Sequence, residues 1–298
     1  MRVGFVGLGL MGVPMALNIR RAGHELVIHS ANRQSLATLE AEGASAARSI
    51  ADIARSVDVF CACRVTPEQS REIFLGPDGV IAAGASGLLC IDFATVDPDT
   101  AKAIGAALGA RGIGFLDSPI SGGPYLAVDA TLTAIVGGDP SDVAKAKPIF
   151  DATCKQIRHM GPIGTGVTTK LCNNLISITT HALLAEAMVL GAKAGIDSRQ
   201  LYEALRSSSA RSNSLERVVP NHFLPRNFTA AASLVTIMKD LGCAIDLGRS
   251  LGVDLTLAEA AMRRYETALT AGHAEKDIAA VILPIEAQAG VIVGAAAP

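Results

Sequence analysis

The stretch that decides the fold is GLGLMG at residues 7–12, which directly follows the apolar run VGFV at residues 3–6. Glycines in a GxGxxG spacing, placed after a strand and at the start of a helix, are typical of a dinucleotide-binding turn. Gly7 allows a tight turn, Gly9 lets a pyrophosphate approach the backbone, and Gly12 lets the helix pack closely on the strand. The helix N-terminus offers amide donors to the anion. We therefore predict a dinucleotide site at Gly7, Leu8, Gly9, Met11 and Gly12.

Outward from this turn, short β-branched runs alternate with helical stretches up to about residue 160. The predicted strands are Arg2–Gly7, Glu25–His29, Val57–Cys63, Leu88–Phe93 and Thr131–Gly137, and the predicted helices include Met11–Ala22 and Arg33–Glu42. Such alternation indicates a mostly parallel sheet with helices on both faces. We predict a Rossmann-type doubly wound α/β domain over residues 1–163.

Beyond Gly166 the β-rich runs stop, and the pattern predicts helices only. The predicted helices cover residues 167–194, 232–251 and 255–271, each followed by a glycine, Gly195, Gly252 or Gly272. Glycine is common just after a helix ends, and Asp197 or Ser198 can cap the helix that comes next. The fold class is thus α/β plus all-α, with an all-helical domain over residues 164–298. A long Ala-rich helix suits helix-on-helix association, so we expect a homodimer or homotetramer.

The composition argues against several classes of protein. The formal net charge is −2 with acids and bases interspersed, which provides no basic stripe for nucleic acid. The six cysteines and six histidines lack the spacings of metal sites, so no metal is predicted. We expect the cysteines to be small buried hydrophobes in a reducing compartment. Without about 18 continuous apolar residues to cross a membrane, the chain is predicted to be cytoplasmic, with no membrane partner.

The residues after the second predicted strand bear on the choice of dinucleotide. An acid here would hydrogen-bond the adenosine ribose of NAD, but this chain has Ser30, Asn32 and Arg33, with no acid before Glu40. Hydroxyl, amide and guanidinium groups can hold a 2′-phosphate, which favours NADP. The alternative is that Arg33 is a solvated residue at a helix start and both cofactors bind, so NAD stays open.

A second candidate site lies in GTGVTTKLCNN at residues 164–174. Lys170 and Asn174 are four residues apart, which places them on one face of a helix. Together with the glycine turn, this spacing suggests a proton-transfer group near a nucleotide cofactor. A lone lysine near a helix start is more often only solvated, so the spacing alone leaves that interpretation open.

These motifs resemble those of the β-hydroxyacid dehydrogenases, a family that includes 3-hydroxyisobutyrate dehydrogenase and tartronate semialdehyde reductase. The likeness covers nearly the whole chain through four motifs, at residues 7–18, DSPISGG at 117–123, residues 164–174, and KDL at 239–241. The resemblance implies an NAD(P)-dependent oxidoreductase. Such an enzyme transfers a hydride between a nicotinamide cofactor and a small anionic 3-hydroxy acid, or reduces the matching semialdehyde.

The resemblance also implies a role for individual residues. Lys170 would be the catalytic acid/base, and Asn174 would hydrogen-bond the substrate or hold Lys170. Ser121 and the amides of Gly122 and Gly123 would bind the substrate carboxylate. Thr95 would lie near the nicotinamide, and Lys239 would close over cofactor and substrate. A lysine partly desolvated between domains can have a lowered pKa and take the hydroxyl proton.

The chain departs from the family pattern at a few positions. Arg64 lies in a Cys-Arg-Val run where the family often has Met-Leu-Pro, and it either contacts the cofactor or points to solvent. Ala232 stands where the family often has an aromatic residue, so the shape of the substrate pocket is not carried over. The alternatives are an imine reductase-like NADPH enzyme, which usually has another residue in place of Lys170, and a non-catalytic NAD(P)-binding scaffold.

Overall fold

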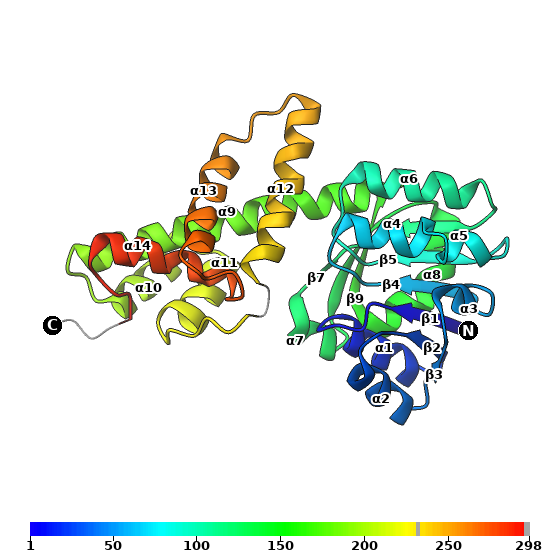
Figure 1. The fold of residues 1–298 in the computed structure, drawn as a ribbon. Helices are drawn as coiled ribbons and strands as arrows, with labels where there is room; N and C mark the ends of the chain where they lie inside the picture. Colours follow the sequence, from blue (N-terminus) through cyan, green and yellow to red (C-terminus); the bar gives the residue numbers. More distant parts are fainter. Residues whose placement is uncertain (231–232, 295–298) are drawn as a thin grey trace. The chain divides into compact units, whose positions relative to one another are not determined.

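The computed structural model describes residues 1–230 and 233–294. The chain forms two compact units, Met1–Leu171 and Cys172–Pro298. Each unit is organised around its own hydrophobic residues: the first has two apolar clusters and the second has one. Figure 1 shows the sheet of the first unit and the helices of the second.

The first unit contains one nine-stranded sheet in the order β3-β2-β1-β4-β5-β6-β8-β7, with β9 paired to β8. Strands β3 to β6 in this order are parallel, and β8 runs antiparallel to β6 and β7. The strands are β1 (Arg2–Val6), β2 (Glu25–His29), β3 (Ser45–Ala46), β4 (Val59–Ala62), β5 (Leu89–Asp92), β6 (Gly114–Asp117), β7 (Ile120–Ser121), β8 (Leu132–Gly137) and β9 (Cys154–Gly161).

Helices cover both faces of this sheet, and alternate residues of each strand supply the two cores. In β1, Val3 and Phe5 belong to the cluster with α1, whereas Val6 belongs to the cluster with α6. Figure 1 shows α4, α5 and α6 on one side of the sheet and α1 and α2 on the other. The helices are α1 (Gly12–Arg21), α2 (Arg33–Ala41), α3 (Ile50–Ala54), α4 (Pro67–Leu75), α5 (Val80–Ala83), α6 (Pro98–Gly109), α7 (Gly123–Val128) and α8 (Pro140–Thr153).

The predicted doubly wound domain is confirmed, and all five predicted strands form within one or two residues of their expected ends. Strands β3, β6, β7 and β9 were not predicted. Strand β9 carries the polar run CKQIRHMG and pairs only with β8, so most of its side chains are exposed and leave no apolar pattern. The expectation that the cysteines are buried is wrong for Cys172, which is exposed.

The second unit is helical throughout its described residues, apart from one isolated β-bridge between Ser233 and Asp277. Its core is aliphatic, and the buried Tyr265 donates a hydrogen bond from its hydroxyl to the carbonyl of Ile178 at 2.7 Å. The elements are α9 (Thr165–Lys193, which starts in the first unit), α10 (Ser198–Arg206), α11 (Asn213–Val218), the π-helical turn η1 (Val219–Phe223), α12 (Leu234–Leu251), α13 (Thr256–Thr270), the 3-10 turn η2 (Ile278–Val281) and α14 (Ile282–Ala289).

The helix ends follow the predicted signals. Gly195, Gly252 and Gly272 adopt positive φ just after α9, α12 and α13. Asp197 caps α10 by accepting a hydrogen bond from the amide of Gln200. The helix predicted from residue 232 begins at Leu234 with Ser233 as its cap, and Ala232 itself lies outside the described residues.

Helix α9 is long and apolar enough to cross a membrane, judged only by length and composition. We expected no stretch of this kind, because polar residues interrupt the apolar sequence of α9. Its mean hydropathy is nevertheless as high as that of a membrane-spanning helix. One face of the helix, including Ile178, Ala185 and Met188, is buried in the core of the second unit. The hydrophobic residues of this face are thus accounted for by packing within the protein.

Candidate active site

Five parallel strands of the first unit end in one row. The last residues of β2, β1, β4, β5 and β6 are Cα partners in sequence across the sheet, namely His29, Val6, Ala62, Asp92 and Asp117. In open α/β sheets, ligands bind outside the carboxyl ends of the strands. The predicted cofactor residues of the first unit follow this row along the chain, and the DSPISGG motif begins in it at Asp117, so the sheet gathers their loops at one edge. Lys239, which the resemblance also places at the cofactor, lies on α12 in the second unit.

The glycine turn between β1 and α1 has the geometry that a dinucleotide requires. Gly7 has φ +93°, and a Cβ there would overlap the carbonyl oxygen of Cys63, while a Cβ on Gly12 would overlap the carbonyl oxygen of Gly7. A Cβ on Gly9, by contrast, would meet no other atom within 4 Å. Two glycines therefore serve close backbone packing, and the third leaves open space before the N-terminus of α1, where a pyrophosphate fits.

The other two residues of the turn are placed differently. Leu8 is buried in the core of the first unit, and Met11 is half-buried against it. Met11 is the N-cap of α1 and makes no capping hydrogen bond with its side chain. Any contribution of Leu8 to cofactor binding therefore comes from its backbone, since its side chain is part of the core.

The loop after β2 holds the three residues expected to read the adenosine ribose. Asn32 caps α2, because its Oδ1 accepts hydrogen bonds from the amides of Gln34 and Ser35. The Ser30 hydroxyl accepts a hydrogen bond from the Asn32 amide at 3.0 Å. Arg33 is the exposed first residue of α2. Asn32 thus has a structural role that the sequence interpretation missed, while Arg33 is accessible to a ligand.

Arg64 follows β4 and lies beside the glycine turn. Its Cδ atom is 3.0 Å from the point where a Cβ on Gly7 would be, and the residue is exposed. The aliphatic part of this side chain therefore covers Gly7 while its guanidinium stays accessible. This placement is compatible with a contact to the cofactor, which was one of the two alternatives for Arg64.

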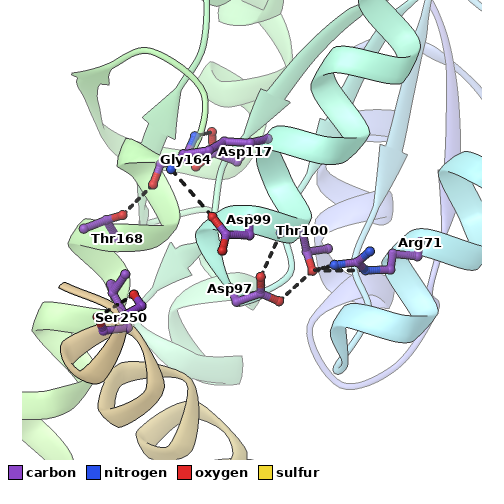
Figure 2. Close-up of polar contacts among 10 residues, drawn as sticks. Arg71, Asp97, Asp99, Thr100, Asp117, Gly164, Thr168 and Ser250 are labelled. Carbon is purple, nitrogen blue, oxygen red and sulfur yellow. Dashed lines mark hydrogen bonds and ion pairs between the residues drawn. The ribbon is translucent and has the colours of Figure 1, made fainter. Parts of the chain in front are cut away.

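Thr95 lies in the loop between β5 and α6, and this loop is anchored by a polar chain of contacts. Asp97 caps α6 through the Thr100 amide at 2.8 Å and accepts a hydrogen bond from the Thr100 hydroxyl at 2.6 Å. Arg71 of α4 donates from Nη2 to the same hydroxyl oxygen at 2.7 Å. Figure 2 shows the chain from Arg71 through Thr100 to Asp97. The loop that carries Thr95 is thus tied at its C-terminal end.

The predicted carboxylate-binding turn, Ser121 to Gly123, joins β7 to α7. Gly122 and Gly123 have φ +137° and +75°, and a Cβ on Gly123 would meet nothing within 4 Å. The space on the Cβ side of Gly123 is therefore open. Asn18 of α1 fixes the far end of α7, because its Nδ2 donates to the carbonyl of Ala127 at 2.8 Å.

Asp117, the last residue of β6, holds the start of the helix that carries Lys170. Its Oδ1 accepts a hydrogen bond from the Gly164 amide and its Oδ2 one from the Val167 amide, both at 2.8 Å. Figure 2 labels Asp117 and Gly164. The side chain is buried, and burial raises the pKa of Asp117 to about 6, although the two amide bonds act in the opposite direction. Lys170 follows Val167 by three residues, so it lies one turn into α9.

In the second unit, Asn174 and Lys239 meet at one buried carboxylate. Asn174 donates from Nδ2 to Oδ2 of Asp240 at 2.7 Å, and the Lys239 ammonium pairs with Oδ1 of Asp240 at 2.6 Å. Asn173 in turn donates from Nδ2 to Oδ1 of Asn174 at 3.1 Å. Two residues that the resemblance assigned to the site, Asn174 and Lys239, are thus linked through a residue to which it assigned no role.

Sequence reasoning missed Asn18, Asp117 and Asp240 as residues that fix the site. Each lies inside a quoted motif, but its partner is far along the chain: 109, 47 and 66 residues away, respectively. The available signal was a polar residue inside each motif to which the resemblance assigned no role. Among the described residues, no group of three or more His, Cys, Asp or Glu side chains is arranged to hold a metal ion.

Comparison with known proteins agrees with this geometry. Residues 2–161 match the family model of the NAD binding domain of 6-phosphogluconate dehydrogenase, and residues 164–285 match "NAD-binding of NADP-dependent 3-hydroxyisobutyrate dehydrogenase". The chain is 35% identical over 286 residues to the NAD-dependent L-serine dehydrogenase of Pseudomonas aeruginosa, covering 94% of this chain and 96% of that protein. It is 30% identical over 291 residues to 2-hydroxy-3-oxopropionate reductase of Escherichia coli, covering 97% and 98%.

A solved structure is similarly close. The 3-hydroxyisobutyrate dehydrogenase of Mycobacterium tuberculosis with L-serine has 30% sequence identity and a TM-score of 0.88, with 96% of this chain and 99% of that chain covered. The matches extend over both units and over nearly the full length of these relatives. The protein therefore belongs to the β-hydroxyacid dehydrogenase family and is an NAD(P)-dependent oxidoreductase that acts on small 3-hydroxy acids or the matching semialdehydes.

Proposed function

We propose that Lys170 is the general acid/base of this oxidoreductase and that Ser121, Gly122 and Gly123 bind the substrate carboxylate. The observation that carries the proposal is the row of strand ends from His29 to Asp117. The glycine turn and the Ser121–Gly123 turn follow this row along the chain, and Asp117 in the same row binds the start of the Lys170 helix. A dinucleotide, a small anion and a proton-transfer group are therefore served from one edge of the sheet.

The proposed chemistry follows from these residue types. The amides of Gly122 and Gly123 and the Ser121 hydroxyl hold the carboxylate, which fixes the orientation of the carbinol carbon, separated from the carboxylate by one carbon in a 3-hydroxy acid. A neutral Lys170 takes the hydroxyl proton as the carbinol carbon loses its hydride, and in the reverse direction protonated Lys170 gives that proton to the developing alkoxide. The bound nicotinamide cofactor supplies the acceptor or donor of the hydride. For Asn174 we propose a hydrogen bond to the substrate or to Lys170, and for Lys239 closure over cofactor and substrate, as the resemblance implies. Both side chains contact Asp240.

For the cofactor we propose binding at Gly7, Leu8, Gly9, Met11, Gly12 and Thr95, and a preference for NADP over NAD. Ser30, with no acid beside it, removes the repulsion that a carboxylate would exert on a 2′-phosphate. Asn32, Arg33 and Arg64 are exposed at the same edge of the sheet and supply polar and positive groups. A guanidinium binds a phosphate through charge-assisted hydrogen bonds.

We further propose a homodimer or homotetramer in the cytoplasm, with the two domains divided at residues 163 and 164. Support for association comes from α9, where Ile176, Leu183 and Leu190 are 69%, 63% and 71% exposed. These residues recur at a seven-residue spacing, which places them in one stripe along the helix. An apolar stripe on an Ala-rich helix fits packing against the same helix of a second copy.

The test of the proposed function is an assay of 3-hydroxy acids and their semialdehydes with NADP and NAD, alongside matched primary alcohols that lack the carboxylate. We expect turnover of the acids, with kcat/KM roughly tenfold to a hundredfold lower for the uncharged alcohols, the size of a lost charge-assisted contact. Equal kcat/KM for acid and alcohol would remove the carboxylate assignment. Turnover of cyclic imines but not of any hydroxy acid would overturn the assignment of the substrate class.

A further inference from the structure

Asp117 is a buried residue of the DSPISGG motif to which no chemical role has been assigned above. It is 1% exposed, and its two carboxylate oxygens accept hydrogen bonds from the amide of Gly164, just before α9, and from the amide of Val167, in the first turn of α9. Burying a charge is costly unless it is hydrogen-bonded. A charge-assisted bond to each oxygen offsets that cost and attaches the helix to the end of β6 at two points.

Close backbone contacts at Gly166 also hold the start of α9. A Cβ on Gly166 would lie 2.6 Å from the carbonyl oxygens of both Asp117 and Ile135, so only glycine lets α9 begin against β6 and β8. Across this contact, a Cβ on Gly137 would lie 2.8 Å from the Gly166 amide nitrogen. The first turn of α9 is therefore held by close backbone contact as well as by the two hydrogen bonds.

We propose that Asp117 is a positioning residue of the reaction, which fixes the first turn of α9 and thereby sets the place of Lys170 relative to the Ser121–Gly123 turn. This inference rests on the proposed role of Lys170. Ser121 lies four residues after Asp117 in the sequence, and Lys170 lies three residues after Val167, whose amide donates to Asp117. The Asp117 carboxylate joins these two segments of the chain. Its hydrogen bonds therefore control the distance between the Ser121–Gly123 turn, which binds the substrate, and Lys170, which deprotonates it.

The raised pKa of Asp117 agrees with this picture. Desolvation is its largest cause, which means that the fold keeps the carboxylate in an environment unfavourable to its charge. Asparagine has the same shape but only one carbonyl oxygen, so it can accept one of the two amides and must turn its NH₂ group toward the other. Asp117→Asn therefore changes the attachment of the helix with little change in packing volume.

The experiment compares Asp117→Asn, Lys170→Ala and the double variant, with Asp139→Asn as a matched control. Asp139 caps α8 through the Ser141 amide at 2.7 Å, and α8 carries no residue of the proposed site. For Asp117→Asn we expect kcat to fall roughly tenfold to a hundredfold, the cost of a small misplacement of a catalytic group. The KM for the hydroxy acid and the Kd for the cofactor should stay within about twofold, because neither binding turn is altered.

The double variant separates positioning from a general effect on the fold. If Asp117 acts only through Lys170, the double variant turns over within about twofold of Lys170→Ala alone, because the two losses are not additive. Losses that multiply, or a fall in kcat matched by a rise in cofactor Kd, would overturn the inference. Wild-type kcat in Asp117→Asn, with Lys170→Ala inactive, would overturn it while leaving the proposed function intact; an active Lys170→Ala would overturn the proposed function itself.

Asp117→Ser serves as a second variant if the asparagine variant does not fold. Its hydroxyl oxygen accepts one amide and its smaller side chain places no steric demand on Gly137 or Gly166. The same split is expected, with a lowered kcat and unchanged KM and cofactor Kd. A serine variant with wild-type kcat would contradict the inference in the same way.

Discussion

Asn174 and Asp240 are joined by a hydrogen bond of 2.7 Å between Nδ2 and Oδ2, across 66 residues of sequence. The other oxygen of Asp240 pairs with the Lys239 ammonium at 2.6 Å. One carboxylate therefore contacts both an amide from α9 and an ammonium from α12. The arrangement explains in physical terms why an aspartate follows the lysine in the Lys-Asp-Leu motif.

Asp240→Asn should lower kcat/KM and weaken the fold, because Lys239 loses its buried ion partner. We expect the free energy of unfolding to fall by about 1–3 kcal/mol, the usual cost of leaving a buried polar group unsatisfied. Steady-state kinetics and urea denaturation measure the two effects. Asp246→Asn is the control, since Asp246 lies on the same helix with its side chain 76% exposed; equal losses in both variants would contradict the role of Asp240.

Lys170→Ala should lower kcat by roughly 10²- to 10⁴-fold, the range of acid/base contributions, with cofactor affinity nearly unchanged. Lys193→Ala, at the far end of the same helix, should keep wild-type turnover. Stopped-flow hydride transfer and fluorescence titration of the reduced cofactor measure the two quantities. A Lys170 variant that retains more than about a tenth of wild-type activity would exclude Lys170 from proton transfer.

The glycines of the first turn should separate stability from cofactor binding. Gly12→Ala places a methyl group on the Gly7 carbonyl, so we expect the free energy of unfolding to fall by about 1–3 kcal/mol, as in overpacking. Gly9→Ala meets no protein atom but fills the space before α1, so it should leave the melting temperature unchanged and raise the cofactor Kd roughly tenfold or more. The opposite pattern, a destabilised Gly9→Ala with normal cofactor affinity, would contradict the placement of the pyrophosphate.

NADPH should bind more tightly than NADH, with Arg33 contributing to the difference. A charge-assisted contact to the 2′-phosphate is worth about 1.5–3 kcal/mol, or roughly tenfold to a hundredfold in Kd. Arg33→Ala should weaken NADPH alone, and Ser30→Asp should shift the preference toward NADH by repelling the phosphate. Arg55→Ala, at an exposed arginine that directly follows α3, is the control. Equal weakening of both cofactors by Arg33→Ala would show that Arg33 does not read the phosphate.

The stability of the protein should carry a pH dependence that belongs to Asp117. Burial raises its pKa to about 6, whereas an unfolded aspartate titrates near 3.9. Between these two pH values, Asp117 is protonated in the folded protein and ionised in the unfolded chain. The contribution of Asp117 to the free energy of unfolding therefore falls as pH rises from about 4 to about 6. The total fall is about 3 kcal/mol at most. Above that pH range the contribution is constant.

Denaturation of wild type and Asp117→Asn at pH 4.5 and pH 7.5 isolates this effect, because other groups cancel in the difference. The advantage of wild type over the variant should be larger at the lower pH. Asp139→Asn should show no comparable change between these two pH values, because the hydrogen bonds from Ser141 lower the pKa of Asp139 and its contribution is lost only as pH falls below the ordinary range of an aspartate. A difference that does not change with pH would mean that Asp117 keeps an ordinary pKa in the folded protein.

Local patterns were sufficient for much of the fold. Strand β2 was predicted to the residue, because an apolar run ends where a polar loop and a helix cap begin. Strand β9 could not be predicted from an apolar pattern, since an edge strand with exposed side chains needs none. Its position depends on pairing with β8, which is a tertiary interaction.

In the candidate site, too, local features could be predicted from the sequence and tertiary contacts could not. Glycines whose spacing matches a turn could be assigned from sequence, because the constraint is local to Gly7, Gly9 and Gly12. The partner of Asp117 could not, since nothing near DSPISGG indicates that its carboxylate meets an amide 47 residues later. Contacts of this kind arise only when the sheet brings its strand ends into one row.

Helix α9 has a consequence for how this protein tolerates insertions. The boundary between the two units, after Leu171, falls inside this helix rather than in a connecting loop. One alanine inserted after Cys172 would preserve the helix but turn every later residue by about 100° about its axis. Lys170 and Asn174 would then point in different directions, although each would keep its identity. Under the roles proposed for Lys170 and Asn174, activity therefore requires the correct rotational phase along α9. Single substitutions do not alter this phase, whereas insertions and deletions do.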